Sequence, residues 1–464
     1  MPHIHLLKKN TDLLALHRAN PQRYPFLLQS IAHRADVGRF DILFAFPGDV
    51  LQLDSLQSDL DFLDALDARW QAESADLDGS QLNNSDLNTP DLDKGAIPIN
   101  EDSLPFSGGW FLFLAYELAG QVEVSLSLPE AVDGLPIAYA ARVPAAVIID
   151  HKKQQTFMVA EAGRESLLDD ISTDISGISN AVSPPTTSRV LGTITFLEEE
   201  ANRYLQGVNR IKDYIVEGDV FQVNLSRKWQ GECDVSVTPA DIYERLCSQN
   251  PAPFAGLAVM GEAAVISSSP ERLVQTSASG VVNTRPIAGT RPRAASPVDD
   301  IALQNELLAH PKERAEHIML IDLERNDLGR ISVPGSVEVN ELMVLESYTH
   351  VHHIVSNVRG RLRPEITPGQ VIRAVFPGGT ITGCPKVRCM EIVAELEQQG
   401  RGAYTGAMGY LNLDGSMDLN ILIRTITHTE KQISFRAGAG IVADSVADKE
   451  IEETRAKARG LLLI

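Results

Sequence analysis

The glycine-rich segment at residues 377–386 (PGGTITGCPK) constrains the fold of this chain more than any other stretch. Its glycines predict a tight turn, and Pro385 suits the first position of a helix, where a missing backbone N–H has no cost. Apolar residues follow at helical spacing and predict the buried face of that helix. Backbone N–H groups at a helix start favour an anion, and Lys386 lies just inside the helix. We therefore expect an anion-binding turn at this point.

The charge of the chain restricts its partners. The formal net charge is −21 over 464 residues, which argues against nucleic acids and anionic membranes. A small anionic substrate would need a metal ion or a few basic side chains to reverse the local field. No apolar stretch approaches the roughly 18 residues of a membrane-spanning helix, and no signal peptide pattern begins the chain. The four cysteines lack zinc or CxxC spacing, so we expect reduced thiols and a cytoplasmic location.

Hydrophobic periodicity predicts a mixed α+β body. Helical spacing of apolar residues is found over residues 196–217, 299–325 and 446–462. Strand-like runs cover residues 110–119, 145–150, 264–268, 273–276, 281–287, 404–411, 419–428 and 433–442. Asp414-Gly415, between two of these runs, is a hairpin signal. Because the strands come in runs and do not alternate with helices, we expect antiparallel sheets and not a doubly wound parallel fold.

Two segments look like exposed insertions. Residues 74–104 are rich in Asp, Asn, Ser and Gly, and residues 172–189 are rich in Ser and Thr. Neither segment has the apolar density to pack, so we expect both to be mobile surface loops. Both lie in an N-terminal region, residues 1–189, which precedes a C-terminal region, residues 190–464.

Two predicted helices each carry a pair of carboxylates at positions i and i+3. The first pair is Glu313 and Glu316, and the second is Glu450 and Glu453. This spacing places both carboxylates of a pair on one helix face. Two facing pairs could hold one Mg²⁺, which prefers oxygen ligands and keeps several waters. Taken alone, each pair is more typical of a solvated helix face than of a metal site.

A few polar residues stand where the pattern expects apolar strands or turns. Glu271 follows a turn between two apolar strands, Arg424 interrupts an apolar run, and His353 lies within another. The glycines of residues 437–440 (AGAG) would let backbone N–H groups approach a carboxylate closely. Taken singly, each has a structural alternative: a core histidine, a paired strand charge or a bulge.

Together these residues resemble the chorismate-utilising enzymes. The resemblance rests on four motifs in the order of that family, at residues 286–290 (PIAGT), 322–330 (DLERNDLGR), 379–386 (GTITGCPK) and 438–445 (GAGIVADS). The family includes component I of anthranilate synthase and of aminodeoxychorismate synthase, and the isochorismate and salicylate synthases. The resemblance is strong over residues 190–464, and the N-terminal third is similar to the two aminating branches. It implies a mixed α/β sandwich in which two large, mainly antiparallel sheets with outer helices enclose a buried active site.

The resemblance also implies roles for individual residues. Glu316 and Glu453 resemble the family's Mg²⁺ ligands, and Glu313 and Glu450 resemble the residues that support them. Glu271 resembles the general acid that helps the C4 hydroxyl of chorismate to leave, and a buried glutamate with a raised pKa can donate that proton. The catalytic set is completed by Gln222, His353, Thr380 and Lys386. The residues that match the substrate-binding groups are Tyr404, Arg424, Gly438, Ala439, Gly440 and Lys457.

Two positions distinguish the branches of the family. Gln222 lies at a position where isochorismate and salicylate synthases resemble one another. Both have a lysine there that activates water. A glutamine cannot act as that base, so we favour ammonia over water as the nucleophile. Ala288 stands where many aminodeoxychorismate synthases have a lysine that is thought to attack C2. The alanine is similar to anthranilate synthase and suggests that ammonia adds directly.

The N-terminal region favours the other aminating branch. Residues 39–42 (RFDI) and 105–120 are similar to aminodeoxychorismate synthases, and residues 27–30 (LLQS) depart from the LLES motif of tryptophan-regulated anthranilate synthases. We therefore favour 4-amino-4-deoxychorismate as the product, in p-aminobenzoate and folate biosynthesis, with anthranilate synthase as the alternative. The chain carries no glutaminase signature, so ammonia is expected from a separate glutamine amidotransferase subunit in a heterodimer. Ser30 marks the candidate N-terminal pocket for a tryptophan-like ligand.

Overall fold

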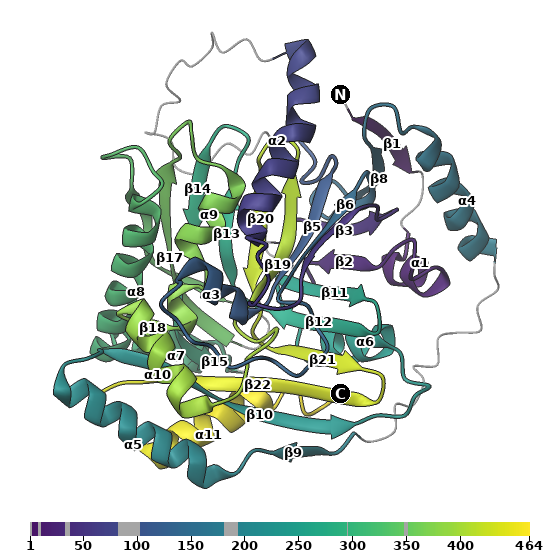
Figure 1. Cartoon of the computed structure of the whole chain (residues 1–464). Coiled ribbons are helices and arrows are strands. Elements are labelled where there is room, and N and C mark those ends of the chain that lie inside the picture. Colours follow the sequence, from purple (N-terminus) through teal and green to yellow (C-terminus); the bar gives the residue numbers. More distant parts are fainter. Residues whose placement is uncertain are drawn as a thin grey trace.

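Two large antiparallel sheets form the centre of this protein (Figure 1). The structure is a computed structural model and describes residues 2–7, 11–32, 38–81, 103–180, 194–294, 296–347 and 351–464. The first sheet has 12 strands. Eleven of them follow the order β1 (His3–Leu7), β8 (Gln155–Ala160), β7 (Ala145–Asp150), β3 (Phe40–Ala45), β2 (Phe26–Gln29), β11 (Phe254–Met260), β12 (Ala263–Ser269), β21 (Thr425–Thr429), β22 (Gln432–Ile441), β10 (Gln222–Glu232) and β18 (Gly383–Cys384). The twelfth, β9 (Phe196–Glu198), pairs with β10.

The second sheet has 10 strands and is also antiparallel. Here β16 (Glu338–Ser347) pairs with β17, and the other strands follow the order β15 (Ile287–Pro292), β17 (Val351–Arg361), β14 (Val281–Thr284), β13 (Arg272–Thr276), β20 (Met417–Ile421), β19 (Ala407–Asn412), β5 (Gly109–Leu114), β6 (Ala138–Val143) and β4 (Val50–Leu53). Strands from residues 1–189 and 190–464 share both sheets, since β2 pairs with β11 and β5 with β19.

Helices pack on the outer faces of the sheets and at their ends (Figure 1). Among the described residues, none of them combines the length and apolar character needed to cross a membrane. Their bounds are α1 (Leu13–Ala19), α2 (Phe62–Gln81), α3 (Ala119–Val122), α4 (Ser166–Asn180), α5 (Ala201–Glu217), α6 (Pro239–Gln249), α7 (Pro297–Ala309), α8 (Pro311–Gly329), α9 (Pro368–Val375), α10 (Lys386–Glu397) and α11 (Ala447–Ala458), with 3₁₀ turns η1 (Tyr116–Leu118) and η2 (Gly379–Ile381).

The space between the two sheets is filled at one end by aromatic side chains. Phe26 of β2 stacks on Phe111 of β5 with ring centroids 4.0 Å apart, and Phe44 of β3 meets Phe111 edge to face. Each of these rings is at most 1% exposed. Aromatic burial on this scale contributes strongly to holding two sheets together. The predicted α+β architecture with two antiparallel sheets is therefore confirmed.

Several predicted boundaries are wrong, for identifiable reasons. The helix predicted over residues 299–325 is broken at His310, because Pro311 cannot continue α7 and begins α8. The helix predicted from residue 196 begins only at Ala201, since residues 196–198 pair with β10 as β9. Helices α2 and α4 continue to Gln81 and Asn180, so the two predicted loops begin as helix. The later parts of those loops, residues 82–102 and 181–189, lie outside the described residues.

One pair of strands presents a polar face toward the second sheet. In β10 and β22, the direct cross-strand partners are Asn224 with Gly440, Ser226 with Gly438, and Lys228 with Arg436. Alternation along the strands puts all of these on one face and leaves Ala437, Ala439 and Ile441 buried on the other. The residues on the polar face provide the floor of the site described next.

Candidate active site

Two glycines of β22 are required by their neighbours. A Cβ atom on Gly438 would lie 2.7 Å from the Tyr404 hydroxyl, and one on Gly440 would lie 2.3 Å from Nε2 of Gln222. Any side chain there would displace the residues that flank it. Ala439 faces away, into a cluster with α5 residues such as Val208. The backbone of this segment is thus exposed to the space between the sheets, as the sequence predicted for a carboxylate clamp.

Lys457 reaches the same glycines from α11. Its Nζ donates to the carbonyl oxygen of Gly438 at 3.0 Å and pairs with Oε1 of Glu453 at 2.9 Å. Helix α11 packs on β22, which carries this lysine to the edge of the clamp. A positive charge is therefore held beside backbone groups that can bind a carboxylate.

Glu271 is a buried acid between β12 and β13. Its side chain is 5% exposed, and burial raises its pKa to about 7, while the Thr380 hydroxyl, the Ile287 backbone and Arg424 act in the opposite direction. In the described part of the chain, its Oε1 has no hydrogen-bond partner. A carboxyl of this kind is substantially protonated near neutral pH and can donate a proton to a substrate oxygen.

Arg424 stands in the break between β20 and β21 with a left-handed φ of 52°. Non-glycine residues adopt this conformation rarely, and it is enriched at functional sites. Burial lowers the pKa of its guanidinium, and the nearby Glu271 raises it. No ion pair of Arg424 is found among the described residues, so its charge is available to a substrate anion.

His353 lies on β17 directly opposite Thr290 of β15. Its Nδ1 is 3.0 Å from the Thr290 hydroxyl, and burial lowers its pKa to about 4. The imidazole is therefore neutral at physiological pH and acts as a hydrogen-bonding group and not as a charge.

Gln222 and Glu316 join β10 to α8. Nε2 of Gln222 donates to Oε1 of Glu316 at 2.6 Å, and the Gln222 side chain is 6% exposed. Burial raises the pKa of Glu316, and the adjacent Glu313 adds to that effect. Since an amide has no basic lone pair, Gln222 orients this carboxylate and cannot activate water.

Glu316 and Glu450 share two lysine neighbours, whereas Glu313 pairs with Arg291 at 3.3 Å and Glu453 pairs with Lys457. Lys312 and Lys457 lower the pKa of both Glu316 and Glu450, although burial raises it more in each case. Oxygen donors of this kind suit Mg²⁺ chemically. Within the described residues, however, no three such side chains converge closely enough to hold a metal ion by themselves.

Lys386 has a partner inside the protein. Its ammonium pairs with Oδ2 of Asp327 in α8 and donates to the carbonyl of Val375. The sequence predicted an anion ligand here, but the structure commits this charge to a contact between α10 and α8. Pro385 lies one residue earlier than predicted, as the non-helical N-cap residue of α10, and the preceding Gly383-Cys384 pairs with β10.

Two further residues complete the wall near Glu271. Ala288 of β15 is 7% exposed and follows Ile287, whose backbone faces Glu271. Glu324 of α8 is 6% exposed, and burial raises its pKa to about 8, with Asp327 and Glu271 adding to the rise. Sequence analysis assigned no role to Glu324. The sequence does contain a pattern that could have identified Glu324: it is an acid on a helix face that is otherwise formed by the apolar residues Leu320, Ile321 and Leu328.

Ser30 lies apart from these residues. It directly follows β2, and three strands, β11, β12 and β21, separate β2 from β22. Its backbone N–H donates to Oδ1 of Asp41 at 2.9 Å, and Gln29 donates to Oδ2 of the same aspartate. The structure thus brings Glu271 close to Thr380, Arg424 and Lys457, joins Gln222 to Glu316, and places Ser30 elsewhere.

Comparisons with known proteins agree on one family. A model of that family, described as chorismate binding enzyme, matches residues 50–463. Component 1 of aminodeoxychorismate synthase from Bacillus subtilis is 41% identical over 370 residues, 77% of each chain. Component 1 of anthranilate synthase from Synechocystis is 37% identical over 477 residues, 95% of this chain and 90% of the relative. The crystal structure of anthranilate synthase component I from Streptococcus pneumoniae superposes with a TM-score of 0.76 at 32% identity, covering 91% of this chain and 92% of that one.

Proposed function

Because this chain belongs to the family of chorismate binding enzymes, we propose that it aminates chorismate with ammonia to give 4-amino-4-deoxychorismate. The observation that carries the amination is the hydrogen bond from Gln222 to Glu316, which puts an amide where the hydrating relatives are expected to have a base. Ammonia needs no such base, since its own lone pair attacks carbon. The relative from Bacillus subtilis supports the product assignment.

The substrate would be held by its two carboxylates. Arg424 and Lys457 supply positive charge, and the backbone between Gly438 and Gly440 supplies N–H donors at close range. Tyr404 closes the site beside Gly438 and contributes a phenol, whose pKa is raised to about 12 by burial. These groups supply the local positive field that a dianion needs in a chain of net charge −21.

Glu271 would act as the general acid. Its proton passes to the C4 hydroxyl as the C–O bond breaks, so that water leaves and Glu271 becomes a carboxylate. Ammonia forms the new C–N bond at C4, the carbon that loses the hydroxyl, and gives up a proton that can return to Glu271 and restore the charge balance. Thr380 lies against the Glu271 carboxyl and His353 lines the same space as a neutral donor or acceptor.

We further propose that Mg²⁺ is bound by Glu316 and Glu453, supported by Glu313 and Glu450. Their oxygen chemistry fits the ion, and water and the substrate carboxylate would complete its shell. When bound, the ion would neutralise the carboxylate on the ring and stabilise charge that develops there. The hydrogen bond from Gln222 would orient Glu316 toward it.

Anthranilate synthase is the second candidate, and Ala288 favours it. The methyl group at this buried position offers no nucleophile, so ammonia would add directly at C2 of the ring. Loss of pyruvate would then yield anthranilate. The relative from Synechocystis, which covers nearly the whole chain, carries that name.

In either case we propose that a glutamine amidotransferase subunit supplies the ammonia. Amination itself is tested by incubating the purified chain with chorismate, Mg²⁺ and ammonium chloride, and following chorismate by liquid chromatography. We expect consumption that requires ammonium. Conversion to isochorismate at the same rate without ammonium would show that water is the nucleophile and overturn the proposal.

A further inference from the structure

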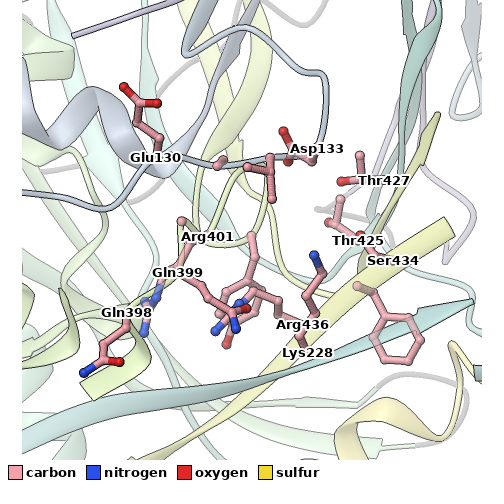
Figure 2. Close-up of a pocket in the computed structure, with 15 residues that line it drawn as sticks. Glu130, Asp133, Lys228, Gln398, Gln399, Arg401, Thr425, Thr427, Ser434 and Arg436 are labelled. Carbon is pink, nitrogen blue, oxygen red and sulfur yellow. The ribbon is translucent and has the colours of Figure 1, made fainter. Parts of the chain in front are cut away.

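A cavity lies beyond Tyr404 on the polar face of β10 and β22. Its volume is about 220 Å³, and Lys228, Arg436, Arg401, Asp133 and Thr427 are among the residues that line it. Figure 2 shows the Lys228 side chain pointing into the cavity, with Asp133, Thr425 and Thr427 on the far side. This volume corresponds to roughly seven water molecules, enough for a small metabolite.

Two cations face this cavity as direct neighbours. Lys228 and Arg436 are cross-strand partners in β10 and β22, and their side chains project from the same face. Like charges directly opposite one another are destabilising in a sheet. Burial lowers the pKa of Lys228, and Arg436 adds to that effect. The pair therefore has an unfavourable interaction that an anion between them would remove.

Neither cation is fully satisfied by the protein. Arg436 is 5% exposed, donates from Nε to Ser226 and pairs through Nη2 with Glu397, each at 3.0 Å. Its Nη1 is buried without a hydrogen-bond partner, and in the described part of the chain no hydrogen bond or ion pair is found for the Lys228 ammonium. A buried donor without a partner destabilises the folded state, and more so when it is charged.

The walls of the cavity are formed by closely packed backbone. A Cβ atom on Gly400 would lie 2.3 Å from the backbone N of Ala131, and one on Gly402 would lie 1.9 Å from Oδ2 of Asp133. The Asp133 carboxylate accepts from the backbone N–H of Leu135 at 3.2 Å. The cavity is thus preformed, and it does not need a ligand to shape it.

The charges at the cavity select the ligand. Lys228, Arg401 and Arg436 line the cavity together with Glu130 and Asp133, and the buried Glu397 pairs with both arginines, so the formal charges cancel. The unfavourable contact is the local one between Lys228 and Arg436. A single negative charge placed between these two cations is stabilised by both, whereas a phosphate dianion would add repulsion from Asp133 and Glu130. Hydroxyls of Thr427 and Ser434 line the same space and can donate to its oxygens.

We propose that this cavity binds a small monocarboxylate between Lys228 and Arg436, separately from the proposed chorismate site. The carboxylate would accept from the Lys228 ammonium and from Nη1 of Arg436. Its position also connects it to the active site, because Tyr404 and Thr425 line the cavity and Arg401 donates to the backbone oxygen of Asn224 at 2.7 Å.

Acetate and inorganic phosphate are the probes for this proposal. The full chain is titrated by isothermal calorimetry with sodium acetate or sodium phosphate against sodium chloride of equal ionic strength. Three proteins are compared: the wild type, Lys228→Met and Lys457→Met. The last variant removes a cation from the chorismate site and leaves the cavity intact.

We expect acetate to bind the wild type and Lys457→Met with similar affinity, and Lys228→Met at least tenfold more weakly. Lys228→Met should melt no lower than the wild type in chloride, since it relieves the repulsion with Arg436. No acetate binding to the wild type, or equal binding to Lys228→Met, would overturn the site. Loss of binding in Lys457→Met would place the anion at the chorismate site, and tighter binding of phosphate than of acetate would overturn the ligand class.

Discussion

Nε2 of Gln222 donates a hydrogen bond to Oε1 of Glu316 across 2.6 Å. The amide is enclosed, because a Cβ atom on Gly440 would lie 2.3 Å from the same nitrogen. One side chain thus links β10, β22 and α8, the three elements that carry the clamp and the proposed metal ligand. The same contact excludes general base catalysis at this position.

Removing this contact should impair the site and leave the fold intact. Gln222→Ala frees Glu316 to rotate, and loss of a residue that orients a metal ligand typically lowers activity or metal affinity by about 10–100-fold. We expect a fall of this size in kcat/KM, with a higher Mg²⁺ concentration for half-maximal rate. The exposed Gln230→Ala, on the same strand, is the matched control and should behave as the wild type. An unchanged Mg²⁺ dependence in Gln222→Ala would contradict the orienting role.

Glu316→Gln tests the metal assignment itself. The amide keeps the size of the side chain and removes the charge, so turnover that depends on Mg²⁺ should be lost while the circular dichroism spectrum is preserved. Glu452→Gln changes an exposed acid on α11 and should retain full activity. Near-normal turnover of Glu316→Gln would remove Glu316 from the proposed ligands.

The pH dependence of kcat should report Glu271. Its pKa is raised to about 7, and the active form is the protonated one, so the rate should fall as pH rises above about 7 at a constant concentration of free ammonia. Glu271→Gln should lower kcat by about 10²–10⁴-fold and abolish this alkaline limb. The exposed Glu262→Gln is the control. If Glu271→Gln still loses activity above about pH 7, the fall in rate is caused by the titration of another group.

Glu324 should make stability depend on pH. The native state keeps this proton up to about pH 8, whereas the unfolded chain loses it above about pH 4.5. Stability from this group is therefore complete below pH 4.5 and lost progressively as pH rises to 8. Glu324→Gln should remove that loss and stabilise the protein at pH 8.5 by up to about 5 kcal/mol, because one pKa unit corresponds to about 1.4 kcal/mol and the pKa values of the two states differ by about 3.5.

The measurement is chemical denaturation at pH 5.5 and 8.5. The difference between Glu324→Gln and the wild type should grow with pH, and Asp322→Asn, which changes an exposed acid on the same helix, should show no such growth. Equal differences at both pH values would mean that Glu324 does not carry the proton.

Sequence reasoning identified the parts of the site whose chemistry is local. The AGAG segment, the acid after a strand end at Glu271 and the arginine that interrupts an apolar run all reach one space, because each interrupts a pattern that otherwise specifies a buried strand. Antiparallel pairing was predicted from successive apolar runs separated by short turns, whereas the division into two sheets was implied by the resemblance to the family.

The features that sequence reasoning missed depend on distant partners. Lys386 binds Asp327, 59 residues away, and no local pattern distinguishes this ion pair from an anion site. The Lys228 and Arg436 pair arises only from the register of β10 against β22. The break before Pro311 was accessible from sequence, but the apolar periodicity that continues through it outweighed the proline.

Identification of the product tests the central claim most directly. The purified chain is incubated with chorismate, Mg²⁺ and excess ammonium at alkaline pH, and the products are analysed by mass spectrometry with an assay for pyruvate. The account predicts the mass of 4-amino-4-deoxychorismate with no release of pyruvate. Anthranilate with stoichiometric pyruvate would contradict it and would show that Ala288, and not the N-terminal region, reports the chemistry.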